Sequence, residues 1–212
     1  MNNTLIALFE KLQSFSPQST AILIVITAVI LMLTSDVRRA VVALLVQYTL
    51  LAILIGPRVY GPLTILRIGI GIAICAILLV TIRHARVYAA STLAAQRSSL
   101  AVILYRILTL VFSALAVYAV WQANLLHLSP ADGLVTYALI LSGIFLAATG
   151  NEPLRLGIGI LMAISGFATA TVLLEQGLLV IGLWGVIELL SALAIAASIE
   201  SWADAQQKAS VR

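Results

Sequence analysis

One carboxyl group stands out in this 212-residue sequence because it lies within a long apolar stretch. Glu188 has about ten mainly apolar residues on each side, so at the centre of a membrane helix its short side chain would not reach water. A carboxyl in such a place can take up and release a proton near neutral pH, which is what a proton relay requires. The structural alternative is a protonated or hydrogen-bonded carboxyl that only holds helices together.

Three further polar residues lie within apolar stretches and are candidates for the same ion relay. Arg106 lies about two turns inside its stretch and is predicted either to pair with Glu188 or a partner subunit, or to reach the headgroups along its stem. Arg67 lies about one turn inside its stretch, which favours reaching the headgroups. Gln47 is predicted to hydrogen-bond across helices or to extend a polar path.

Metal, haem or other cofactor sites are not expected, and no residue is predicted to be catalytic. The two histidines, His84 and His127, and the single cysteine, Cys75, are far apart in the sequence and form no ligand pattern. The formal net charge is +4, but the basic residues are spread over the ends of apolar stretches instead of forming a patch. This distribution argues against a nucleic-acid partner.

The elements that must position these residues are membrane helices. The chain is 62% hydrophobic and 9% charged, whereas a soluble domain has about 25% charged residues. A spanning helix needs roughly 20 mostly apolar residues, and seven stretches meet or approach this length. They are Thr20–Leu33, Arg39–Ile55, Leu63–Ile82, Ser99–Trp121, Gly133–Ala148, Leu154–Leu174 and Leu178–Ile199. The sequence therefore predicts an all-α, polytopic membrane protein with about seven transmembrane helices.

The segments outside the spans are short. Apolar residues recur at helical spacing between Leu5 and Leu12, which predicts either a helix lying on the membrane surface or an extension of the first span. The longest connection, His84–Arg97, is predicted to be a partly helical link at the membrane surface.

Basic residues also predict the orientation, because they gather on the cytoplasmic side of membrane proteins. With seven spans, one side of the membrane holds only Lys11 and Arg58. The N-terminus is therefore expected outside and the C-terminus in the cytoplasm, in an inner (cytoplasmic) membrane. The other side holds Arg38, Arg39, Arg83, Arg86, Arg97, Arg155, Lys208 and Arg212.

A faint internal repeat suggests how the spans are grouped. Thr34–Arg39 precedes the second span much as Thr149–Arg155 precedes the sixth, and Gly61–Ile65 opens the third as Gly177–Ile181 opens the seventh. Either these are chance matches between apolar segments, or two three-helix units share one orientation and are joined by the fourth span. The predicted divisions are an N-terminal interfacial segment (1–18), a first three-helix unit (19–88), a connecting segment with the fourth helix (89–128), a second three-helix unit (129–200) and a cytoplasmic tail (201–212).

The last three spans resemble the K subunit of bacterial complex I and the C subunit of multi-subunit cation/proton antiporters. Asn151–Leu161 looks like the loop and start of the second helix of those proteins, and Leu179–Leu190 looks like their third helix, with Glu188 at the place of their buried glutamate. The length and seven-span layout resemble the E component of hydrogenase-4-type membrane hydrogenases. One departure is that the family's second helix often carries another glutamate, where this chain reads Leu161-Met162-Ala163-Ile164.

The resemblance implies a non-catalytic, accessory membrane-arm subunit of a complex-I-like or group 4 hydrogenase-like respiratory complex. Such an energy-coupled oxidoreductase links electron transfer to proton (or sodium) translocation. The expected partners are antiporter-like membrane subunits and lipid. Two alternatives remain open, a stand-alone small transporter and a purely structural subunit of another membrane complex.

Overall fold

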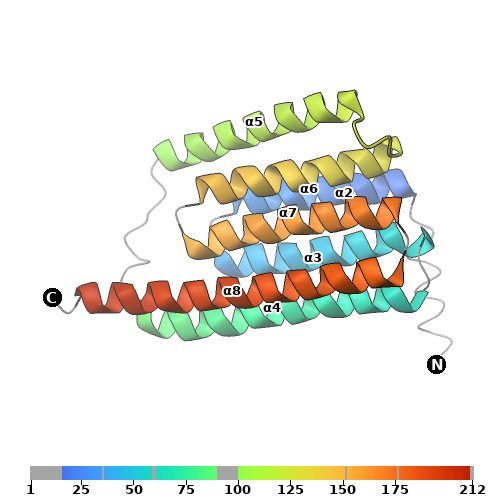
Figure 1. Ribbon diagram of the computed structural model, residues 1–212. Helices are drawn as coiled ribbons and strands as arrows, with labels where there is room; N and C mark the ends of the chain where they lie inside the picture. Colours follow the sequence, from blue (N-terminus) through green and yellow to red (C-terminus); the bar gives the residue numbers. More distant parts are fainter. Residues whose placement is uncertain are drawn as a thin grey trace.

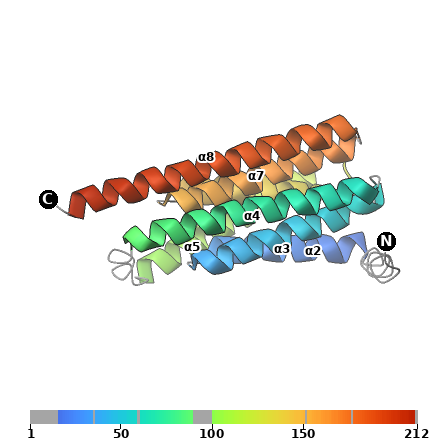
Figure 2. The ribbon, with the colours of Figure 1, turned by 90° about the horizontal axis from the view of Figure 1, so that it is seen from below.

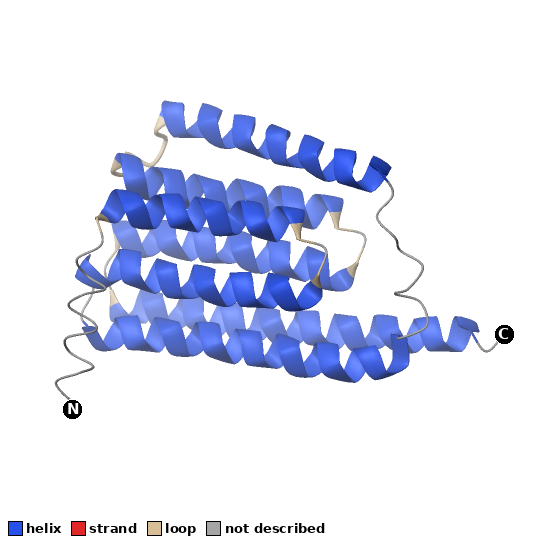
Figure 3. Cartoon of the chain, turned by 180° about the vertical axis from the view of Figure 1, so that it is seen from behind, coloured by secondary structure: helices blue, strands red, loops and turns tan. Residues whose placement is uncertain are grey.

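The computed structural model describes residues 16–34, 36–58, 61–89, 100–150, 152–175 and 177–210. Within these ranges the chain forms seven α-helices and one 3-10 turn, η1 (Gly56–Arg58), joined by loops and without strands (Figure 3). The helices are α2 (Pro17–Leu33), α3 (Val37–Ile55), α4 (Gly61–Ala89), α5 (Leu100–Ala123), α6 (Pro130–Thr149), α7 (Pro153–Leu174) and α8 (Leu178–Ser210).

Local sequence signals explain where several helices begin. Ser16 and Ser129 are the N-caps of α2 and α6, and their hydroxyl oxygens accept hydrogen bonds from the third backbone N–H that follows, at 3.3 and 3.4 Å. In both helices a proline takes the first helical position, where no N–H is needed. Asp36 caps α3 by accepting a hydrogen bond from the Arg38 backbone N–H at 3.1 Å.

The predicted class, an all-α protein with several membrane helices, is confirmed, because six of the described helices are long and apolar enough to cross a membrane. The remaining helix, α2, is apolar but has 17 residues, which give a length of about 25 Å at 1.5 Å per residue. All seven predicted stretches coincide with helices, but α4 and α8 continue beyond their predicted ends at Ile82 and Ile199. The predicted surface helix between Leu5 and Leu12 and most of the predicted link between α4 and α5 lie outside the described residues.

The helices form two layers of three, and consecutive helices run in opposite directions (Figure 1). One layer is α2–α3–α4 and the other is α6–α7–α8, as the view from below shows (Figure 2). Across the layers, α2 packs against α6, α3 against α7 and α4 against α8. The helix α5 lies at one edge, against α6 and α2. The end of the bundle where α2, α4, α6 and α8 begin is called the N-terminal end below, and the opposite end is called the C-terminal end.

The core lies between the layers and consists mainly of aliphatic side chains. Leu44 and Leu51 of α3, Ile74 and Leu78 of α4 and Leu161 of α7 are fully buried. The layers also bury side chains that are not apolar, among them Gln47, Arg67 and Glu188. Since burial of such groups is costly in a membrane, these residues define the candidate site.

Candidate functional site

The centre of the candidate site is an ion pair between α4 and α8. The Glu188 side chain is completely buried, and its Oε1 atom accepts a hydrogen bond from Arg67 Nη2 at 2.9 Å. Close packing of the two helices brings these side chains together. A Cβ at Gly185, one turn before Glu188 on α8, would lie 2.5 Å from the tip of the Ile70 side chain of α4, so the two helices are in close contact at this turn.

Tyr48 of α3 completes the surroundings of the Arg67 guanidinium. The Cζ atom of Arg67 lies 5.9 Å from the centre of the Tyr48 ring, within the range of a cation–π interaction. Gly71 of α4 makes room for this ring, because a Cβ there would lie 2.7 Å from the Cβ of Tyr48. We call Tyr48, Arg67 and Glu188 the ion-pair site.

The ion-pair site has more hydrogen-bonding capacity than the described residues use. The buried atoms without a hydrogen-bond partner include Glu188 Oε2, Arg67 Nε and Nη1, and the Tyr48 hydroxyl. Both amide atoms of Gln47, which precedes Tyr48 in the sequence, are also buried without a partner. Most buried polar atoms in proteins are hydrogen-bonded, to protein or to ordered water. This concentration of unused donors and acceptors indicates a place where water molecules or protons can bind.

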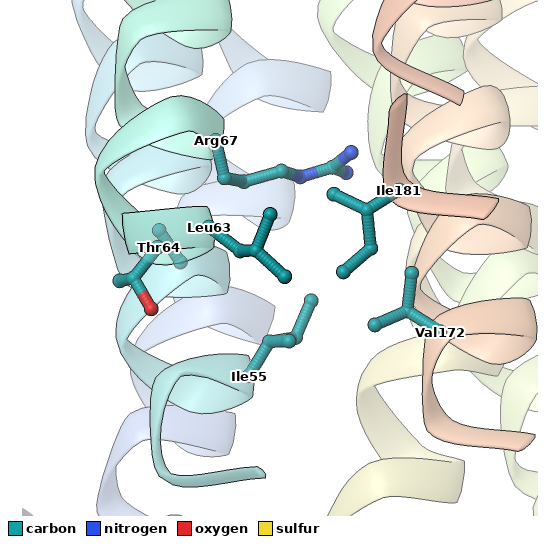
Figure 4. Close-up of a pocket in the computed structure, with 7 residues that line it drawn as sticks. Ile55, Leu63, Thr64, Arg67, Val172 and Ile181 are labelled. Carbon is teal, nitrogen blue, oxygen red and sulfur yellow. The ribbon is translucent and has the colours of Figure 1, made fainter. Parts of the chain in front are cut away.

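A small pocket adjoins the Arg67 side chain. It lies between α3, α4, α7 and α8, on the side of Arg67 that faces the N-terminal end (Figure 4). Its volume of about 10 Å³ is at the lower limit of the 10–15 Å³ that one water molecule needs. The lining residues are Ala52, Ile55, Leu63, Thr64, Arg67, Val172 and Ile181.

Two of the sequence-based interpretations are corrected. Arg67 was expected to extend to the headgroups, but its side chain is 5% exposed and turns inward to Glu188. The suggested pair between Arg106 and Glu188 is not formed, because Glu188 pairs with Arg67 instead, and Arg106 Nη1 lies 3.4 Å from the Leu33 carbonyl oxygen at the end of α2. Arg155 of α7 reaches the same end of α2, where its Nη2 donates to the Met32 carbonyl at 2.6 Å.

Sequence reasoning missed the partners of these arginines. Tyr48 and Arg155 carry no sequence pattern that marks them as functional. The sequence held one signal for the pairing of Arg67 with Glu188. Each residue lies within an apolar span, and a cation in one span can neutralise an anion in another. In the described part of the chain, no group of three or more His, Cys, Asp and Glu residues could hold a metal ion.

The fold and site define a class of protein, namely a membrane-embedded, multi-pass helical protein with a charged pair in its interior. Comparisons of this chain with protein-family models, with curated proteins and with solved structures find no match. The chemistry of the ion-pair site is therefore the basis for a functional proposal.

Proposed function

We propose that this chain is a non-catalytic membrane subunit of a complex-I-like or group 4 hydrogenase-like assembly, in which Glu188 serves as one station for protons. The observation that carries the proposal is the ion pair itself, a fully buried carboxylate 2.9 Å from an arginine between two membrane helices. Ionisable groups at this depth are expensive to insert and are characteristic of proton pathways and ion-coupled machines.

The geometry supports a simple proton-binding step. Glu188 Oε1 is bound to Arg67, whereas Oε2 has no hydrogen-bond partner and can accept a proton. Addition of that proton makes the carboxyl neutral and leaves the Arg67 charge without its counter-ion. The two protonation states therefore differ by one charge in a low-dielectric interior, so a change of charge in a neighbouring subunit would favour one of them.

A proton path needs further protonatable groups near Glu188, and a partner subunit would supply them. The region of α7 from Leu161 to Ile164 lacks the second glutamate that the family resemblance would suggest. Leu183, Val186 and Leu190 of α8 are each more than half exposed on the outer side of the bundle, close in sequence to Glu188. On this proposal an antiporter-like partner covers this outer side of α8, and lipid covers the remaining apolar surface.

The two layers also support the proposed three-helix repeat. Ser16-Pro17 and Ser129-Pro130 begin α2 and α6 with the same capping arrangement. If the repeat is real, the first, second and third helices of one unit correspond to those of the other. The corresponding helices pack against each other, α2 on α6, α3 on α7 and α4 on α8. On this proposal the ion pair joins the third helices of the two units.

The test is to purify the native assembly and to compare the wild-type chain with Glu188→Gln. Co-purification with large antiporter-like subunits and loss of electron-transfer-driven ion movement in the intact Glu188→Gln complex are the expected results. Glu200→Gln is the matched control, because Glu200 lies on the same helix but is exposed near its C-terminal end. Unchanged pumping in the Glu188→Gln complex would refute the proton station.

A structural role is the second candidate function. It is favoured because the ion pair directly bridges α4 and α8. In that case Glu188→Gln would weaken the assembly without a specific effect on ion movement in the complexes that remain.

Purification without partners, together with transport by the reconstituted chain alone, would instead support a stand-alone transporter.

A further inference from the structure

The surroundings of the ion pair differ between the two ends of the bundle. Toward the N-terminal end lies the pocket described above, whose wall includes Arg67 itself (Figure 4). The other lining residues belong to the last turns of α3 and α7 and to the first turns of α4 and α8. The pocket therefore lies between the ion pair and the N-terminal end, where Ile55, Leu63, Val172 and Ile181 also pack together as a small apolar cluster.

Toward the C-terminal end the same helices are closely packed. On α4, Ile74 and Leu78 are fully buried, and on α8, Ala192 is fully buried and Ile195 is 7% exposed. These residues belong to one continuous apolar core. A water molecule that approached the ion pair from this end would have to cross several turns of apolar packing.

Arg67, which lines this pocket, has hydrogen-bond donors without a partner. Only Nη2 is bound to Glu188, whereas Nε and Nη1 are buried without a hydrogen-bond partner. A guanidinium has five N–H donors and cannot lose its charge in a protein. Its remaining donors therefore need acceptors, and the adjoining pocket has room for about one water molecule.

We propose that this pocket is a water site through which the Arg67–Glu188 pair is reached from the N-terminal end of the bundle and not from the C-terminal end. The water path stands on the geometry alone, whereas its meaning for ion movement rests on the proposed function. If Glu188 is a proton station, this water site would connect the station to one side of the membrane. A hydrated proton that enters would protonate Glu188 and leave one water molecule behind.

The experiment measures water access with silver ions, which are smaller than organic thiol reagents and bind thiolates. The full-length chain in its native membrane complex carries Cys75→Ala, which removes the only cysteine, and one new cysteine at a time. Ala52→Cys lies in the pocket wall. After timed silver exposure the protein is unfolded, and the remaining free thiol is counted by maleimide mass shift.

Two matched controls use alanines that are as deeply buried as Ala52. Ala21→Cys lies near the N-terminal end on α2, away from the pocket, and Ala192→Cys lies beyond the ion pair toward the C-terminal end. Ala52→Cys is expected to react at least about tenfold faster than both, because only a hydrated thiol forms thiolate readily. In sealed vesicles this fast reaction should require silver on the side of the N-terminal end.

The proposal would be overturned if Ala52→Cys reacted no faster than Ala21→Cys, if Ala192→Cys reacted equally fast, or if silver acted only from the opposite side. Thr64→Cys is a second pocket probe in case Ala52→Cys does not fold, as judged by size-exclusion chromatography. Silver access and pumping by Glu188→Gln are independent readouts. Slow silver reaction of Ala52→Cys together with loss of pumping in Glu188→Gln would refute only the water path. Fast silver reaction together with unchanged pumping in Glu188→Gln would refute only the proton station.

Discussion

At the scale of single residues, the buried ion pair determines what substitutions will do. Moving two charges out of water costs several kcal/mol per ion, which their mutual attraction offsets only while both partners are present. Arg67 and Glu188 are also chemically unequal. A glutamate can become neutral by binding a proton, whereas an arginine keeps its charge.

Replacement of Glu188 should therefore be more harmful than replacement of Arg67. Glu188→Met leaves the Arg67 cation buried and is expected to lower the free energy of unfolding by about 3–5 kcal/mol. Arg67→Met should cost less, and the double variant Arg67→Met/Glu188→Met should regain most of the loss. Thermal denaturation in detergent measures this order, and a double variant less stable than either single variant would contradict it.

Gln47 offers a separate test, because its amide is fully buried and both of its polar atoms lack a hydrogen-bond partner. Burial of an unpaired polar group costs about 1–3 kcal/mol in proteins. Gln47→Leu is therefore expected to keep or raise the melting temperature. Leu51→Gln, one turn further along α3 and equally buried, is the control that should lower it. A clear loss of stability in Gln47→Leu would show that its amide has partners.

At the scale of the helices, glycines decide how closely α6 and α7 approach each other. A Cβ at Gly143 would lie 2.5 Å from the Ala163 backbone nitrogen, and one at Gly159 would lie 2.5 Å from that of Ala147. The obstacles are backbone atoms, so the helices themselves would have to separate. Small residues at such contacts are the main route to tight helix packing in membranes.

We expect Gly143→Ala and Gly159→Ala each to destabilise the protein by about 1–3 kcal/mol, the range for overpacked sites. Gly69→Ala and Gly182→Ala are matched controls, because a Cβ at either position meets nothing within 4 Å. Both controls should be neutral or slightly stabilising, since glycine is a poor residue inside helices. Melting temperatures of the four variants give the comparison, and equal losses at all four positions would disprove it.

The end of α2 depends on arginines from other helices. Arg155 donates to the Met32 carbonyl at 2.6 Å, and Arg106 lies 3.4 Å from the Leu33 carbonyl. Hydrogen bonds to charged groups contribute about 1.5–3 kcal/mol. Arg155→Met should therefore increase backbone hydrogen exchange in the last turn of α2 more than Arg106→Met does, because its hydrogen bond is shorter. The reverse order would contradict this assignment.

At the scale of the whole molecule, the last helix is longer than the hydrocarbon core of a membrane is thick. The 33 residues of α8 extend about 50 Å at 1.5 Å per residue, whereas the hydrocarbon core is about 30 Å thick. Both α4 and α8 project at the C-terminal end (Figure 1). Arg38, Arg39, Arg83 and Arg155 lie at or near this same end, and we propose that it faces the cytoplasm.

Thiol labelling of intact cells tests this orientation. His127→Cys lies in the loop between α5 and α6 at the N-terminal end, and Asp204→Cys lies in the projecting part of α8. An impermeant maleimide should label His127→Cys in intact cells and Asp204→Cys only after the cells are opened. Three helices separate the two positions, so labelling of both from outside would contradict the proposed crossings as well as the orientation.

The sequence alone determined the class of protein and the positions of its helices. Apolar stretches near 20 residues long permit few structures other than membrane helices, and proline, serine and aspartate mark several of their starts. The single carboxyl at mid-span, Glu188, was likewise visible in the sequence because depth along a helix follows from residue number.

Only the tertiary structure decided which residues Glu188 and the arginines meet. Arg67 and Glu188 are 121 residues apart, and the packing of α4 against α8 places them together. The long arginine stem lets the guanidinium turn to the membrane surface or to the interior from the same backbone position. The direction of the Arg67 side chain is therefore set by the neighbouring helices. For this reason the sequence favoured the membrane surface for Arg67, whereas the structure places it beside Glu188.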